Sequence, residues 1–141
     1  MTDIFDAGKF GAIVALPFQV ANAVTSATNT DLTVPGGANT LYVMPHAGSV
    51  VGISVKASAD VTAGSANFRA HKASTEFADS GYPNPTLDAT NSNASYAKVN
   101  HGALRFAAGN SIGVSYSSTT DAAPTNTNDY DVLLFVSLDP I

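Results

Sequence analysis

Short segments in which apolar and polar residues alternate are the feature that most constrains the fold of this chain. Residues 49–58, 66–73 and 111–117 each alternate in this way, and clusters of Gly, Pro, Asn and Asp separate them. A period of two places successive side chains on opposite faces of an extended strand. Leu, Glu, Lys and Arg, which favour helices, are scarce. The pattern therefore predicts an all-β domain.

The spacing of these segments predicts how the strands are organised. Intervals of 8–12 residues between strands are typical of β-sandwiches and barrels. We expect a jelly-roll-like β-sandwich of about eight antiparallel strands, with another type of sandwich as the alternative. The expected strands are residues 40–44, 49–58, 66–73, 86–90, 95–99, 102–106, 111–117 and 130–138, with 86–90 and 95–99 pairing around the turn at 91–93.

The alternation also predicts which side chains are buried. Gly113 and Ser115 should face outward, because they alternate with larger apolar residues. The side chains expected to face the core include Val51, Ile53, Val55, Phe68, Ile112, Val114 and Tyr116.

The last expected strand, residues 130–138, is apolar on both faces around Leu133, Leu134, Phe135 and Val136. One face of a sandwich strand packs on the core, so the other face needs a second chain or a packed loop to cover it. This strand is the main reason in the sequence to expect an oligomer.

Residues 1–39 differ from the rest of the chain. They are rich in Ala, Val and Asn without clean alternation, and the segment 33–37 ends them. Two interpretations stay open: one or two additional strands packed on the sandwich, or an N-terminal arm that lies along a neighbouring subunit. We accordingly divide the chain into residues 1–39, the arm or additional strands, and residues 40–141, the sandwich domain.

Composition excludes several classes of partner. The chain is 45% apolar and 12% charged, with a net charge of -5, which suits a subunit of an assembly better than a free monomer. Its six basic residues are scattered, so we expect no nucleic-acid binding. No apolar run approaches the roughly 20 residues of a membrane span, and residues 10–24, the nearest candidate, contain Pro17, Gln19 and Asn22.

A search for chemistry finds no catalytic, cofactor or metal site, and we expect no enzymatic activity. There is no cysteine, and we expect no nucleophile elbow, because the one G-x-S-x-G match, G-N-S-I-G at residues 109–113, runs from a turn into an expected strand rather than from a strand into a helix. His46, His71 and His101 lack metal-ligand spacing and are expected at turns or on the surface. Residues 126–131 carry several oxygen ligands that could suit calcium, but they do not match an EF-hand loop, and loop solvation is the preferred interpretation.

Three motifs resemble a β-rich module of tailed-bacteriophage virion proteins. They are M-P-H-A-G-S-V-V-G-I-S-V at residues 44–55, T-A-G at 62–64 and F-A-A-G-N-S-I-G-V at 106–114. The resemblance covers about residues 40–138, and Asn110 stands where the module usually has Asp. The last motif is also similar to the hairpin of trimeric jelly rolls of the tumour necrosis factor and complement head type.

The resemblance implies a structural virion protein of the head decoration, or cement, type. Such a protein would sit on the capsid surface as a homotrimer, bind the major capsid protein and stabilise the shell. The alternative is a tail-fibre, baseplate or receptor (glycan)-binding module. Residues that we expect at interfaces are Phe5, Phe10, Ile13, Leu16, Phe18, Tyr82, Tyr116, Leu134 and Val136.

Overall fold

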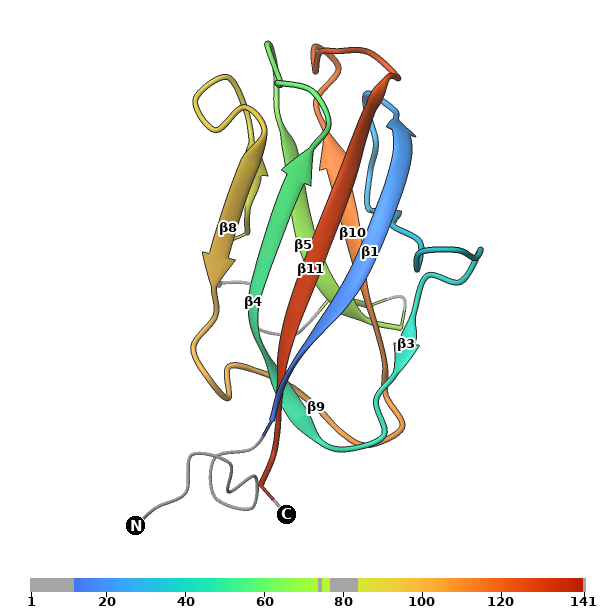
Figure 1. Ribbon diagram of the computed structural model, residues 1–141, viewed down its shortest axis with the longest axis vertical. Helices are drawn as coiled ribbons and strands as arrows, with labels where there is room; N and C mark the ends of the chain where they lie inside the picture. Colours follow the sequence, from blue (N-terminus) through green and yellow to red (C-terminus); the bar gives the residue numbers. More distant parts are fainter. Residues whose placement is uncertain (1–11, 74, 77–83, 141) are drawn as a thin grey trace.

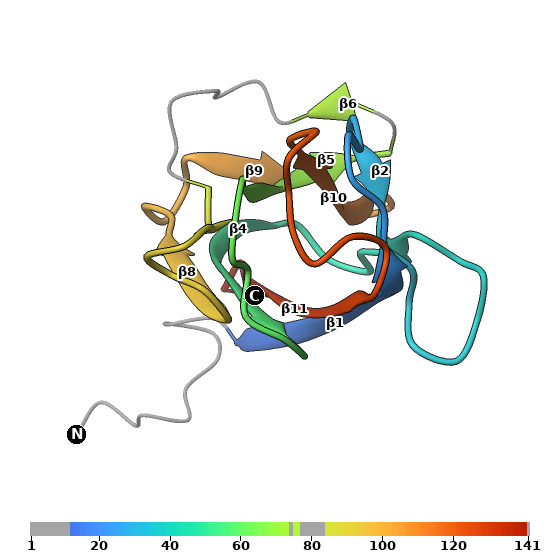
Figure 2. The ribbon, with the colours of Figure 1, turned by 90° about the horizontal axis from the view of Figure 1, so that it is seen from above.

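The chain folds into two packed antiparallel β-sheets, a jelly-roll-like β-sandwich (Figures 1 and 2). The computed structural model describes residues 12–73, 75–76 and 84–140. All regular elements in these ranges are strands, which agrees with the all-β prediction. Figure 2 shows the two sheets as separate layers, with β1, β11 and β4 on one side and β5 and β10 on the other.

The first sheet is built around the last strand of the chain. Its strands follow the order β1-β11-β4-β8, and β9 pairs with the beginning of β4. Every pairing in this sheet is antiparallel. The strands are β1 (Ile13–Ala23), β4 (Gly48–Ala57), β8 (Ala94–Lys98), β9 (Leu104–Phe106) and β11 (Asn128–Leu138).

The second sheet is built around β10 and β5. Its order is β2-β10-β5-β6; β3 also pairs with β10, and β7 with β5. Four of its members are only two residues long. The strands are β2 (Thr30–Asp31), β3 (Tyr42–Val43), β5 (Ala66–Lys72), β6 (Thr75–Glu76), β7 (Thr86–Leu87) and β10 (Ser111–Ser118).

The core lies between the two sheets. An aromatic cluster joins them: the ring of Phe68 lies 5.2 Å from that of Tyr130, and Tyr116 lies 5.9 Å from Tyr130. Edge-to-face arrangements of this kind add to the stabilisation from burial. The backbone N–H of Val24 donates to the hydroxyl of Tyr116, so this buried polar atom is satisfied.

The described part of residues 1–39 forms additional strands of the sandwich. β1 pairs with β11 from Ile13 to Ala23, and β2 pairs with β10. Pro17 lies within β1, which is an edge strand of its sheet, where a missing N–H group is tolerated. Residues 12–39 thus include strands of the sandwich, as in the first interpretation. An arm, the second interpretation, would have to lie within residues 1–11, which are outside the described residues.

The predicted hairpin around residues 91–93 is wrong. β7 pairs with β5 in the second sheet, whereas β8 pairs with β4 in the first. The turn between them is held by Asp88, whose carboxylate accepts hydrogen bonds from the N–H groups of Thr90 and Asn91. The chain therefore crosses from one sheet to the other at this turn.

Two predictions about buried faces are also corrected. Val51 is only half-buried, because a bulge in β4 moves the inward position to Val50. Gly113 and Ser115 are buried, because β10 has strands on both of its edges. The chain packs so closely at Gly113 that a Cβ there would lie 2.7 Å from the carbonyl oxygen of Thr40. The inward positions of Ile53, Val55, Phe68, Ile112, Val114 and Tyr116 are confirmed.

The neighbours Leu134 and Leu133 give a matched test of this alternation. Leu134 is fully buried, whereas Leu133 faces outward and is 41% exposed. We expect Leu134→Ala to lower the free energy of unfolding by about 2–5 kcal/mol. Leu133→Ala should cost less than about 1 kcal/mol, because its side chain is only partly removed from water. Urea denaturation measures both, and equal losses would contradict the register of β11.

A second prediction concerns alkaline pH. Burial raises the pKa of the Tyr130 phenol above its ordinary value of 10.0, and neighbouring Tyr116 raises it further. A folded-state pKa above the unfolded value means that this stabilisation is complete below about pH 10 and is lost as the pH rises through the folded pKa. Tyr130→Phe should therefore lose less stability than the wild type between about pH 8 and about pH 11, as measured by urea denaturation. An identical pH dependence in the two proteins would count against the burial of this phenol.

Candidate functional site

The outer face of the first sheet collects apolar side chains from all four of its principal strands. Ile13 comes from β1, Phe135 from β11, Val51 from β4 and Tyr96 from β8. Ile13 is 70% exposed and Tyr96 is 73% exposed, which is unusual for large apolar side chains that lie on the same surface. We regard this face as the candidate binding surface.

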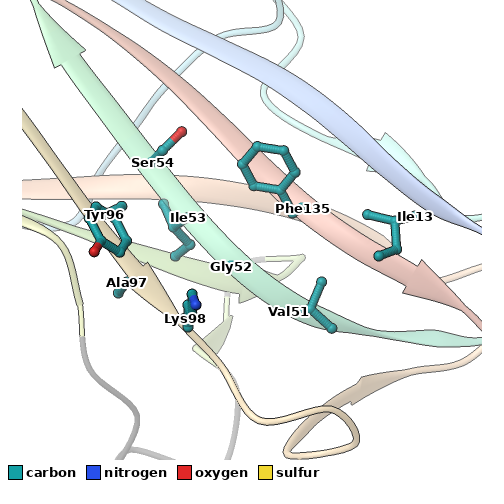
Figure 3. Close-up of a pocket in the computed structure, with 9 residues that line it drawn as sticks. All are labelled: Ile13, Val51, Gly52, Ile53, Ser54, Tyr96, Ala97, Lys98 and Phe135. Carbon is teal, nitrogen blue, oxygen red and sulfur yellow. The ribbon is translucent and has the colours of Figure 1, made fainter.

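These side chains surround a hollow of about 400 Å³, which we call the groove (Figure 3). Such a volume is at the lower end of the roughly 300–1,000 Å³ of small-ligand pockets. Gly52 lies in the middle of the groove, between Phe135 on β11 and Lys98 on β8, its partners in the two adjacent pairings. The groove runs across the strands rather than along one of them.

The groove exists because of two local features of β4. Phe135 pairs with Gly52 and Val136 pairs with Val50, so Val51 is an extra residue that has no partner on β11. Gly52 has no side chain to fill the surface beside it. A Cβ at this position would lie 3.4 Å from the carbonyl oxygen of Ala97 and 3.7 Å from Cδ2 of Phe135. A methyl group would therefore fit, but it would make the groove shallower.

A second hollow, of about 300 Å³, lies on the same face. Pro17, Leu133 and Pro35 contribute to its lining, and Ser54 lines both hollows. Lys56 and Asp131, which are partners in the pairing of β4 with β11, lie at this second hollow. The two hollows together make one extended surface of mixed apolar and polar character.

The chemistry of the groove suits binding. Among its described lining residues, Lys98 is the one charged side chain, and the polar groups are the hydroxyls of Ser54 and Tyr96. Apolar walls would take up aliphatic or aromatic groups, and Lys98 would favour a nearby negative charge.

Most of the predicted interface residues do not contribute to this surface. Ile13 lines the groove, but five others are buried inside the sandwich and leave no area for a partner, because their strands turn these positions inward. Phe5, Phe10 and Tyr82 lie outside the described residues. The five buried side chains are Leu16, Phe18, Tyr116, Leu134 and Val136.

His71 is buried, contrary to the prediction of a surface histidine. Its Nδ1 contacts the carbonyl oxygen of Ala73, and its Nε2 lies 3.1 Å from the carboxylate of Asp31 without hydrogen-bond alignment. The contact connects β5 to β2 across β10, so we assign His71 a structural role.

The other two histidines lie near the end of β11. His46 Nε2 is 3.0 Å from the carbonyl oxygen of Asp139, whose carboxylate pairs with Arg105. The hydrogen bond from Arg105 holds the pKa of Asp139 below its ordinary value, and the charges of Arg105, His46 and His101 add to this effect. Arg105 and His101 are exposed, whereas His46 and Asp139 are half-buried, and the pair of Arg105 with Asp139 ties β9 to the residue that follows β11.

The segment considered for calcium binding uses its oxygen atoms within the fold. Buried Asn128 accepts from the N–H of Ala59 and donates to the carbonyl oxygen of the same residue. The carboxylate of Asp129 accepts from the N–H of Asn22. Within the described ranges, no three His, Asp or Glu side chains converge as metal ligands would, and no helix has the length and hydrophobicity to cross a membrane.

The aromatic residues of the sequence point to Tyr96 as a possible surface contact, but sequence reasoning missed Val51, Gly52 and Lys98 as parts of a site. Two signals were available: the apolar character of β11 on both faces, and the alternation of Tyr96 and Lys98 along β8. Neither signal indicates which strands are adjacent, so the groove could be found only from the topology.

Comparison with known proteins shows the fold. No protein-family model matches the chain, and no curated protein matches its sequence. A chain of the Cyanophage Pam1 capsid asymmetric unit is similar, with a TM-score of 0.50 and 17% identity over 92% of this chain and 87% of its own. A chain of the native virion of Kashmir bee virus at neutral pH aligns with a TM-score of only 0.37 and 14% identity, over 100% of this chain and 78% of its own, and adds no argument. The chain thus shares the sandwich fold of a chain from a phage capsid asymmetric unit.

Proposed function

We propose that this chain is a non-enzymatic structural protein of a bacteriophage virion, of the head decoration type. The observation that carries the proposal is the fold similarity to a chain of the Cyanophage Pam1 capsid asymmetric unit. The alignment covers 92% of this chain and 87% of the other, so the similarity extends over most of both chains.

The surface of the protein is consistent with this role. The outer face of the first sheet exposes Ile13, Tyr96 and Leu133 around its two hollows. Only 12% of the residues are charged, so a partner that covers the surface has few charges to remove from water. A face of this kind is favourable when a neighbouring protein covers it. We infer that the half of the face around Leu133, Pro17 and Pro35 contacts the shell.

The proposed mechanism is physical. Homotrimers would sit over gaps between copies of the major capsid protein and connect them against internal pressure, without contacting nucleic acid or membrane. Burying about 1,000 Å² at about 25 cal/mol per Å² gives about 25 kcal/mol before the costs of association. Repetition of such contacts over the shell would make attachment stable even where each contact is weak.

One observation favours a second candidate, a tail or receptor-binding module that recognises glycans. Tyr96 is 73% exposed at the edge of the groove, beside the polar groups of Lys98 and Ser54. An exposed aromatic ring next to polar groups could stack on a sugar. Glycan-array binding by the chain, together with its absence from purified heads, would select this candidate.

Attachment to the head is tested with the pair Leu133→Glu and Val43→Glu. Leu133 lies on the proposed contact surface, and Val43, which is 66% exposed, lies on the other sheet. We expect purified heads to carry the wild type in a fixed ratio to the major capsid protein, as measured by quantitative mass spectrometry. Leu133→Glu should reduce this occupancy at least about tenfold, because it places a charge in an apolar contact.

Val43→Glu controls for the added charge and should leave the occupancy unchanged. Heads that lack the protein should also release their DNA at a lower temperature. If purified wild-type heads do not contain this chain, the decoration role is refuted.

The proposed oligomer is tested in solution. Analytical ultracentrifugation of the purified chain should give three times the 14.4 kDa of one chain. A monomer at every concentration, both free and on the particle, would contradict the trimer. The decoration role would be unaffected, because the occupancy measurement tests it separately.

A further inference from the structure

Strand β8 forms an open edge of the first sheet. It comes last in the order β1-β11-β4-β8, and Figure 1 shows it as the outermost strand of that sheet. Within the described part of the chain, no strand pairs with the side of β8 that faces away from β4. An unpaired edge offers its backbone N–H and C=O groups to another strand, and natural proteins usually protect such edges.

The register of β8 on β4 determines which of its backbone groups are free. The N–H of Ala57 donates to the carbonyl oxygen of Asn93, the residue before β8, over 2.7 Å. The N–H of Val99, the residue after β8, donates to the carbonyl oxygen of Val51 over 3.1 Å. In an antiparallel ladder, residues that bond to one neighbour alternate with residues whose groups point to the other side. The residues of β8 whose N–H and C=O groups point away from β4 are therefore Ala94, Tyr96 and Lys98.

The other edges of the sandwich are better protected than β8. In β1, Pro17 has no N–H, and its carbonyl oxygen accepts a hydrogen bond of 3.0 Å from the hydroxyl of Tyr42. Further along β1, Gln19 exchanges two backbone hydrogen bonds with Thr33. The described edge strands of the second sheet are only two residues long, which limits what can pair with them. β8 is five residues long, without a proline and without a bulge in its pairing with β4.

The sequence of β8 is complementary to a second copy of itself in antiparallel orientation. A register centred on Tyr96 places this residue opposite its own copy, and it places Ala94 opposite Lys98 of the second copy. All three outward-pointing residues then lie in hydrogen-bonded pairs, and any other register that pairs such residues loses at least one pair within the strand. Lys98, the one charged residue of β8, lies about 14 Å from its own copy, so like charges do not face each other.

We propose that β8 pairs in antiparallel orientation with β8 of a second copy of this chain, so that the two first sheets become one continuous sheet. The two-fold axis passes between the two Tyr96 residues and is perpendicular to the sheet, which places both outer faces on the same side. The Tyr96 side chains, each 73% exposed in a single chain, then lie next to each other. A two-fold contact closes on itself, and both open edges are covered.

The contact is small and separate from the threefold contact of the proposed trimer. One pair of short strands covers less area than the roughly 1,600 Å² of a standard stable interface. The pairing should therefore form where copies are concentrated and dissociate in dilute solution. On a shell it would connect one trimer to the next, but the pairing itself does not depend on the proposed role in a virion.

The register is tested with introduced cysteines, because the natural chain contains none. Chains with Ala94→Cys and chains with Lys98→Cys are mixed at about 1 mM, since a small interface binds weakly. In the proposed register these two positions are opposite each other at about 5.5 Å between Cα atoms, which a disulfide can span. Each position lies about 14 Å from its own copy, beyond the reach of a disulfide.

We expect the mixed disulfide to form at least about ten times faster than either homodisulfide under mild oxidation, as followed by mass spectrometry. Both substituted positions are exposed, so chance collisions would produce all three species at similar rates.

Pairing through the backbone is tested by adding Tyr96→Pro or Tyr96→Thr to both chains. Proline removes the N–H that points outward and leaves the hydrogen bonds between β8 and β4 in place. We expect Tyr96→Pro to lower the rate of the mixed disulfide to that of the homodisulfides. Tyr96→Thr keeps this N–H and should retain most of the difference. Circular dichroism checks that each variant keeps its strands.

Equal rates for the mixed disulfide and the two homodisulfides would overturn the proposal. A homodisulfide that forms faster than the mixed one would exclude the proposed register. An unchanged rate in folded Tyr96→Pro would exclude pairing through the backbone, and if this variant does not fold, the comparison of the three disulfides decides alone. Because none of these measurements uses a phage particle, their failure can be distinguished from failure of the decoration role.

Discussion

Strand β11 is the element on which the rest of the structure depends. It pairs with β1 on one edge and β4 on the other, and its even-numbered residues from Tyr130 to Val136 are buried against the second sheet. Because side chains alternate strictly along a strand, a shift of one residue would expose this entire set and bury Asp131. The same register that builds the core must therefore turn Leu133 and Phe135 outward, and it creates the apolar outer face as a consequence.

The predictions succeeded where local alternation and burial coincide, and failed where the outcome depends on distant partners. Ile53 and Val55 face inward as predicted because regular pairing with β11 continues through them. Val51 does not, because the bulge beside it depends on how β4 and β11 meet, which no local pattern encodes. Residues 13–23 alternate poorly, and β11, which orders them as a strand, lies more than 100 positions along the chain.

The candidate site was even less accessible from sequence. The apolar character of β11 on both faces correctly indicated an uncovered surface, but the predicted interface residues Leu16, Phe18 and Val136 proved to be core. Apolar residues on an amphipathic strand are the same types on either face, so hydrophobicity alone cannot separate core from interface. Gly52 carries no hydrophobic signal at all, yet the groove is open because this residue lacks a side chain.

The bulge and the glycine in β4 produce a hollow at a place where a flat sheet would present a continuous surface. A flat apolar face would attract any other flat apolar face, including those of misfolded chains. A hollow bounded by Phe135 and Tyr96 favours instead a partner whose shape fits between these two side chains. The rest of this outer face lies around Leu133, beside Lys56 and Asp131, whose opposite charges restrict which surfaces can pack there. The geometry of one strand pair thus divides the outer face into an apolar hollow that selects by shape and a neighbouring area that selects by charge as well.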